Sequence, residues 1–144
     1  MNYHTLYDKD YSEWIQETLK QIKAKNFDRV DWNNLIEEIE SMGKSERRAL
    51  LSLFTQLLEH LLKMSYWDIE KERNYRHWAS EVVNFRAQIE SRLEDSPSLR
   101  RELPIFYERA HSTAIKSVSK LFNLDQKAYI SLENALDEEW FPEL

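Results

Sequence analysis

The residues best suited to chemistry are a run of glutamates near position 40 and a later histidine. The run holds Glu37, Glu38 and Glu40, and the histidine is His60. Carboxylates and imidazole can together hold a metal ion or transfer protons. Successive helical residues are about 100° apart, so Glu38 and Glu40 lie on opposite flanks of an apolar stripe and Glu37 points away from it. The glutamates cannot all converge on one ion, and we expect His60 to pair with one flanking glutamate as an interhelical hydrogen-bond partner.

A second candidate is the Glu-x-x-His motif formed by Glu108 and His111. Di-iron and di-manganese bundles need two such motifs and two further glutamates. No other histidine of the chain follows a glutamate at this spacing, so the pattern does not predict a dinuclear centre. Helical geometry places His111 near Tyr107 and Val118, which favours a partly covered structural histidine. The sequence therefore predicts no metal ion and no other cofactor.

A third candidate is the charged segment Arg73-Asn74-Tyr75-Arg76-His77. All-α ribonucleases of the HEPN type use an arginine followed by a histidine at the start of a helix. Their spacer is longer than the three residues found here. RNA also carries a phosphate backbone that basic residues must neutralise, whereas this chain is acidic. We expect the segment to be a charged connection and the exposed first turn of a helix.

The composition limits both fold and function. The 144 residues carry 20 Lys and Arg against 26 Asp and Glu, a net charge of −6 that argues against general nucleic-acid binding. A single glycine excludes phosphate-binding loops, and the absence of cysteine excludes disulfides and thiolate metal sites. We see no secretory signal and no apolar stretch long enough to span a membrane, so we expect a cytoplasmic protein without membrane contact.

Apolar residues recur at helical spacing along the chain, which predicts an all-α fold. The expected helices cover residues 12–26, 31–43, 44–66, 75–94, 98–122 and 126–136, with Pro104 either kinking or splitting the fifth. Asp31 is the expected N-cap of the second helix, and Gly43 is its expected end. The segment 44–66 is apolar nearly all round, so it should be the buried central helix. We predict a compact single-domain bundle of five to six helices over residues 1–144.

Two aromatic pairs are candidates for a protein interface. They are Tyr66-Trp67 at the end of the central helix and Trp140-Phe141 in the acidic tail over residues 137–144. Aromatic anchors dominate interfaces when they fill a pocket, but the same residues can cover the chain's own core. The tail can dock on its own body, on a second copy or on another protein, and the sequence leaves these alternatives open.

Several short motifs follow one another in an order shared with a known family. They are Tyr7-Asp8-Lys9-Asp10 before Trp14, the glutamate run within residues 35–43, His60-Leu61-Leu62-Lys63, and Ser96-Pro97-Ser98-Leu99. With Trp78 and Arg86, they make the chain from about Tyr7 to Ala114 resemble the bacterial family called domain of unknown function 29 (DUF29). The resemblance implies a compact all-α domain that occurs as a short stand-alone protein, and it brings no established activity or ligand. The segment beyond about Phe122 matches least.

The same motifs suggest one polar cluster. Its members lie at the edges of apolar stripes on three helices that should pack together: Glu38, Glu40, His60, Lys63 and Arg86. Such a cluster can fix the register of helices without chemistry, which is the interpretation we favour. The alternative is that it lines a ligand pocket.

Taken together, these patterns favour a non-enzymatic interaction domain that either forms a homo-oligomer or binds another protein. Two alternatives stay open. One is a small helical enzyme, or a metal-binding or ligand-binding bundle, that uses the interhelical glutamate, histidine and arginine cluster. The other is the HEPN-like ribonuclease built on Arg73 and His77.

Overall fold

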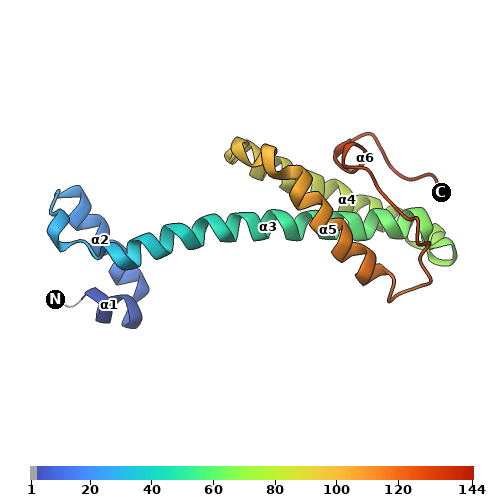
Figure 1. The fold of residues 1–144 in the computed structure, drawn as a ribbon. Helices are drawn as coiled ribbons and strands as arrows, with labels where there is room; N and C mark the ends of the chain where they lie inside the picture. Colours follow the sequence, from blue (N-terminus) through green and yellow to red (C-terminus); the bar gives the residue numbers. More distant parts are fainter. Residues whose placement is uncertain (1–2) are drawn as a thin grey trace. The chain divides into compact units, whose positions relative to one another are not determined.

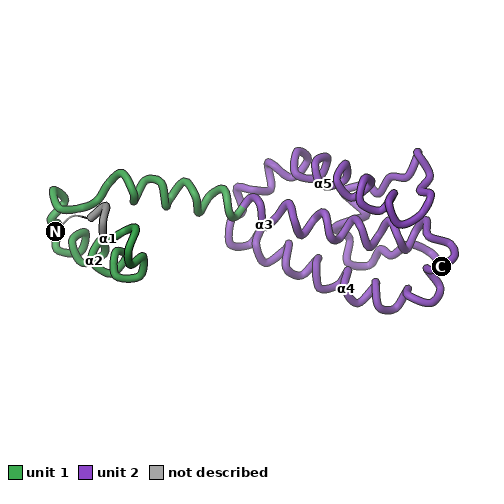
Figure 2. Tube along the Cα trace, turned by 90° about the horizontal axis from the view of Figure 1, so that it is seen from below, with its two compact units in different colours: residues 1–46 green, residues 47–144 purple. Residues whose placement is uncertain are grey.

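The computed structural model describes the backbone of residues 3–144 and the side chains from residue 6 onward. This part of the chain contains six α-helices, two short 3₁₀ helices and no strand, which confirms the predicted all-α fold. The chain divides into two compact units, unit 1 (Met1–Glu46) and unit 2 (Arg47–Leu144), which Figure 2 colours separately. That both units belong to one domain stays a prediction.

Unit 1 begins with two short helices. In Figure 1 it comprises α1 (Tyr3–Lys9), α2 (Tyr11–Lys23), a 3₁₀ helix (Phe27–Arg29) and the first part of α3 (Trp32–Tyr66). Asp10 caps α2, because its carboxylate accepts a hydrogen bond from the Glu13 N–H at 3.0 Å. Lys25 adopts a left-handed φ of 60° just after α2. Two backbone hydrogen bonds of a Schellman motif close the helix there.

The core of unit 1 is small. Among its described residues, Trp14 and Val30 are the buried residues of apolar type. The indole Nε1 of Trp14 donates to Asp31 Oδ2 at 3.2 Å, and Asp31 Oδ1 accepts from the Asn34 N–H at 3.4 Å. Asp31 therefore caps α3, as predicted, and also ties α3 to α2.

Helix α3 runs without a break from Trp32 to Tyr66, so the prediction that Gly43 ends a helix is wrong. A terminating glycine adopts a positive φ, and no described glycine does so. Glycine inside a helix costs about 1 kcal/mol relative to alanine, which the hydrogen bonds of an unbroken helix offset. The segments predicted over 31–43 and 44–66 are one helix.

Unit 2 continues α3 and adds α4 (Asp68–Asp95), a 3₁₀ helix (Pro97–Glu102), α5 (Leu103–Val118) and α6 (Leu132–Leu136). The predicted charged connection is helical, because α4 begins at Asp68 and its first turn carries acids that suit the positive end of a helix. Pro104 lies in the first turn of α5, where its missing N–H is tolerated, so the predicted fifth helix is split. The last helix is shorter than the predicted 126–136.

The second part of α3 forms the centre of unit 2 and lies between α4 and α5 (Figure 2). Its buried side chains are Leu50, Leu53, Phe54, Leu57, Leu58, Leu61, Leu62 and Met64. Ala110 and Ala114 of α5 are fully buried, and side chains this small let α5 approach its neighbours closely. The predicted buried central helix is confirmed.

Both aromatic pairs pack against this core. Trp67 stacks on Trp78 with ring centroids 6.1 Å apart and on Phe122 with centroids 5.0 Å apart. Trp140 and Phe141 are partly buried against the same cluster. Within the described residues, no helix combines the length and the apolar character that a membrane span requires.

Candidate functional site

The residues of the predicted polar cluster are divided between the two units. Glu38 and Glu40 belong to unit 1, whereas His60, Lys63 and Arg86 belong to unit 2. Glu40 is exposed, and each of the other four contacts different partners. The contacts of these residues therefore form several separate local arrangements.

In unit 1, Glu38 joins helices that are distant in sequence. Its carboxylate accepts hydrogen bonds from the hydroxyls of Tyr11, at 2.6 Å, and Tyr7. These bonds lower the pKa of Glu38, and the bond to Glu38 raises the pKa of Tyr7 to about 12. The Tyr7 ring also packs edge-on against Trp14 with centroids 4.8 Å apart. Glu38 thus links α1 and α2 to α3 beside the small core.

In unit 2, His60 of α3 contacts Glu81 of α4. Its Nδ1 is 2.8 Å from the Gln56 carbonyl oxygen, and its Nε2 contacts Glu81 Oε2. The other carboxylate oxygen of Glu81 is 3.3 Å from His77 Nε2. A neutral imidazole has one N–H, so only protonated His60 donates to both acceptors. The interhelical partner of His60 is Glu81, not the predicted flanking glutamate of residues 37–40.

Lys63 of α3 lies against an aromatic ring of α4. Lys63 Nζ lies 5.8 Å from the ring centroid of Trp78, within the range of a cation–π contact. Trp78 is itself buried in the core of unit 2. In the part of the chain whose side chains are described, no three His, Cys, Asp or Glu residues are grouped so as to hold a metal ion.

Arg86 holds the C-terminal segment against α4. Its side chain is only 5% exposed, and its Nε and Nη2 donate to the carbonyl oxygens of Ala135 at 2.8 Å and Asn134 at 3.1 Å. Its Cζ lies 4.9 Å from the ring centroid of Phe141. Burial lowers the pKa of Arg86, although an arginine stays charged. The guanidinium thus satisfies carbonyls at the end of α6 and anchors the aromatic tail.

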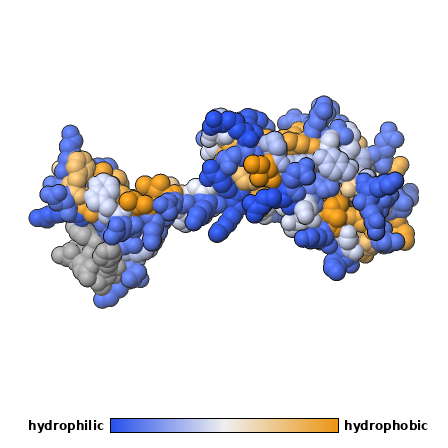
Figure 3. Space-filling view, in the orientation of Figure 1, coloured by the Kyte–Doolittle hydropathy of each residue, from blue (hydrophilic) through white to orange (hydrophobic). Residues whose placement is uncertain are grey.

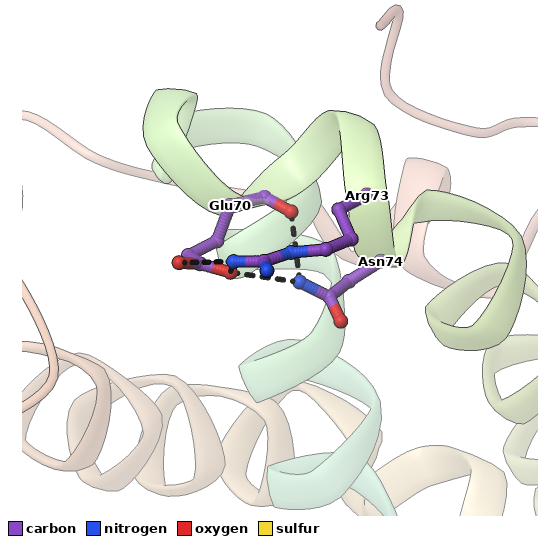
Figure 4. A network of polar contacts seen from close by, with 3 residues as sticks. All are labelled: Glu70, Arg73 and Asn74. Carbon is purple, nitrogen blue, oxygen red and sulfur yellow. Dashed lines mark hydrogen bonds and ion pairs between the residues drawn. The ribbon is translucent and has the colours of Figure 1, made fainter.

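The arginine of the ribonuclease alternative is already paired. Figure 4 shows Arg73 Nη2 donating to both carboxylate oxygens of Glu70, at 2.9 and 2.8 Å. Asn74 Nδ2 donates to the backbone oxygen of Glu70 at 2.9 Å and to its carboxylate at 3.1 Å. Nη2 of Arg73 therefore pairs with an acid of its own helix.

His111 is buried, and is thus more fully covered than the partly covered histidine that was predicted. Its Nε2 accepts a hydrogen bond from the Ile130 N–H at 3.1 Å, so this nitrogen carries no proton and the ring is neutral. Burial lowers the pKa of His111. Its ring lies against Tyr129 and Tyr107, with centroids 4.7 and 5.8 Å away. The imidazole connects α5 to the segment that precedes α6.

The lowered pKa of His111 implies a pH dependence of stability. Because unfolded histidine has a pKa of about 6.5, the unfolded state binds the extra proton as the pH falls below this value. We expect the free energy of unfolding to decrease there, by at most about 1.4 kcal/mol per pH unit for one proton. His111→Gln keeps an acceptor for Ile130 but does not titrate, so this component should vanish. Urea unfolding of both proteins between pH 5 and 8 measures it, and identical pH profiles would contradict the assignment.

A comparison with known protein families places these contacts in context. The family model described as domain of unknown function DUF29 matches residues 6–141. The chain belongs to this family. The match includes the C-terminal segment that Arg86 anchors, although the sequence motifs resembled the family least beyond about Phe122. No curated protein and no solved structure matches the chain. The description assigns no activity to DUF29 proteins.

The interface candidates that the sequence analysis missed lie on unit 1 of this DUF29 protein. On α3, Ile36, Ile39 and Met42 are 51%, 58% and 65% exposed, and we call them the α3 stripe. On α2, Ile15 and Leu19 are also exposed, and we call them the α2 stripe. Figure 3 shows that apolar side chains reach the surface in this unit. Helical spacing marks such residues as a stripe, but it does not show whether a neighbour covers them.

Proposed function

We propose that this DUF29 protein is a non-enzymatic helical interaction protein that binds a protein partner through unit 1. The observation that carries the proposal is the α3 stripe. Ile36, Ile39 and Met42 follow one another at helical spacing and are each more than half exposed. Isolated apolar residues are common on protein surfaces, whereas a contiguous apolar row suits a helix-in-groove contact.

The energetics of unit 1 support this proposal. Its described buried apolar residues are Trp14 and Val30, so the unit removes little apolar surface from water by itself. A core this small leaves a folded unit marginally stable. Fully burying an exposed aliphatic side chain contributes about 1.5–3 kcal/mol. A partner that covers the α3 stripe would therefore both gain affinity and stabilise unit 1.

The polar residues support a non-enzymatic role. His60 is held by Gln56 and Glu81, His111 by Ile130, and the guanidinium of Arg86 by the C-terminal segment. Each of these side chains thus has a packing role that accounts for its position. An active site instead brings reactive groups together in a concave pocket.

A photo-crosslinking experiment tests the proposal. A photoreactive amino acid replaces Ile39, or in a matched control Ile69, which lies on α4 of unit 2 and is 88% exposed. After irradiation in cells that naturally produce the protein, we expect a covalent adduct with a protein chain from position 39 and little from position 69. Equal yields from the two positions, or no protein adduct from position 39, would contradict the proposed function.

A further inference from the structure

The two stripes of unit 1 have edges of opposite charge. The α2 stripe borders a shallow groove of about 550 Å³ lined by Gln16, Leu19, Lys20, Lys23 and Ala24. The α3 stripe lies in the segment 32–43, which holds three glutamates, and the first basic residue of α3 is Lys44, beyond Met42 along the helix. One apolar face of the unit is therefore bordered by positive charge and the other by negative charge.

The charged residues also occupy equivalent positions around the two helices. At about 100° per residue, Lys23 and then Lys20 follow Leu19 around α2, on one side of the α2 stripe. Around α3, Glu40 and then Glu37 follow Ile36 on the same side of the α3 stripe. The glutamates of α2, Glu13 and Glu17, lie further round the helix, beyond Lys20.

This arrangement selects one way of packing. When two helices pack face to face and antiparallel, edges on the same side of each helix meet, as they do in antiparallel coiled coils. An antiparallel pair of α2 and α3 thus brings Lys20 and Lys23 next to Glu37 and Glu40 while the two stripes bury each other. A pair of two α3 helices would instead bring glutamates together, and a pair of two α2 helices would bring lysines together.

We infer that the partner of unit 1 is a second copy of this chain. The α3 stripe of one copy packs antiparallel on the α2 stripe of the other, and two-fold symmetry repeats the contact with the roles exchanged. The inference rests on the proposed function and specifies its partner. The supporting observation is charge complementarity. Each copy of the chain carries both exposed apolar stripes, and the edges of the two stripes have opposite charges.

The test exploits this reciprocity with two charge-reversal variants of the full chain. The first double variant, Glu37→Lys with Glu40→Lys, makes the edges of both stripes basic. The second double variant, Lys20→Glu with Lys23→Glu, makes the edges of both stripes acidic. We expect the parent to sediment at twice its chain mass of 17.5 kDa. Each variant alone should show a dimer dissociation constant raised at least about tenfold, because like charges meet at both contacts. An equimolar mixture of the two variants should form a dimer again, because opposite charges meet at both contacts.

A charge-reversal variant of unit 2 serves as the control. Arg109→Glu with Lys116→Glu reverses two exposed charges of α5 in unit 2 and should dimerise like the parent. A parent that stays monomeric at its highest soluble concentration overturns the inference. So does a dimer that both variants form as well as the parent, since another surface must then hold it. The inference is also overturned if both variants are monomeric, their circular dichroism matches that of the parent, and their equimolar mixture stays monomeric. In each of these cases, the proposed function still stands if the photo-crosslink from position 39 joins this chain to a different protein.

Discussion

Replacing Arg86 by methionine is expected to lower the free energy of unfolding of unit 2 by about 3 kcal/mol. Methionine keeps an apolar stem of similar length, so the change removes mainly the guanidinium. The carbonyl oxygens of Ala135 and Asn134 then lose donors that bind them at 2.8 and 3.1 Å, and Ala135 is fully buried. Phe141 also loses the cation that lies against its ring. The chain gains no new partner for these groups.

Urea unfolding followed by circular dichroism measures this loss, with Arg109→Met as a matched control because Arg109 is exposed. Arg86→Lys should fall between the parent and Arg86→Met, since lysine keeps a charge but lacks the planar fork. Faster hydrogen exchange in residues 131–144 would show that the tail has detached. If Arg86→Met unfolds at the urea concentration of the parent, Arg86 does not anchor the tail.

The sequence predicted the helical fold because local patterns determine it. Apolar spacing identified the helices from α2 onward but missed α1, and the short polar side chain of Asp31 identified the start of α3. The segment 44–66 was recognisable as buried because few polar residues interrupt it. Gly43 and Asp68 mark where this reasoning failed. A glycine permits a helix to end but does not force it to, and a charged segment can be the exposed first turns of a helix.

The partners of the candidate site residues were harder to predict. Periodicity gives the side of a helix on which a residue lies, but it does not give the residue that faces it across an interface. His60 was correctly expected to pair between helices, yet its partner is Glu81. Glu81 follows His77 by four residues, a spacing that places both on one side of α4 and was the available signal. The partners of Arg86 are backbone carbonyls, which no residue type reveals.

Replacing Trp14 by alanine is expected to unfold unit 1 while unit 2 stays folded. Trp14 is one of the two described buried apolar residues of the unit, and removing a buried aromatic ring costs about 3–5 kcal/mol. The change also takes the indole donor from Asp31, a buried carboxylate, and the ring contact from Tyr7. Among the described residues of unit 1, Val30 is then the one buried apolar side chain left, which is too little to offset this loss.

Hydrogen exchange measured by mass spectrometry resolves the two units. In Trp14→Ala, peptides from residues 11–31 should exchange rapidly, whereas peptides from residues 50–64 should keep the protection of the parent. Leu58→Ala is the matched change in unit 2, where Leu58 is fully buried, and it should raise exchange over residues 50–64. Because both stripes are built on unit 1, Trp14→Ala should also abolish the inferred dimer. If Trp14→Ala instead removes protection from both units together, they unfold as one cooperative domain, as the sequence predicted.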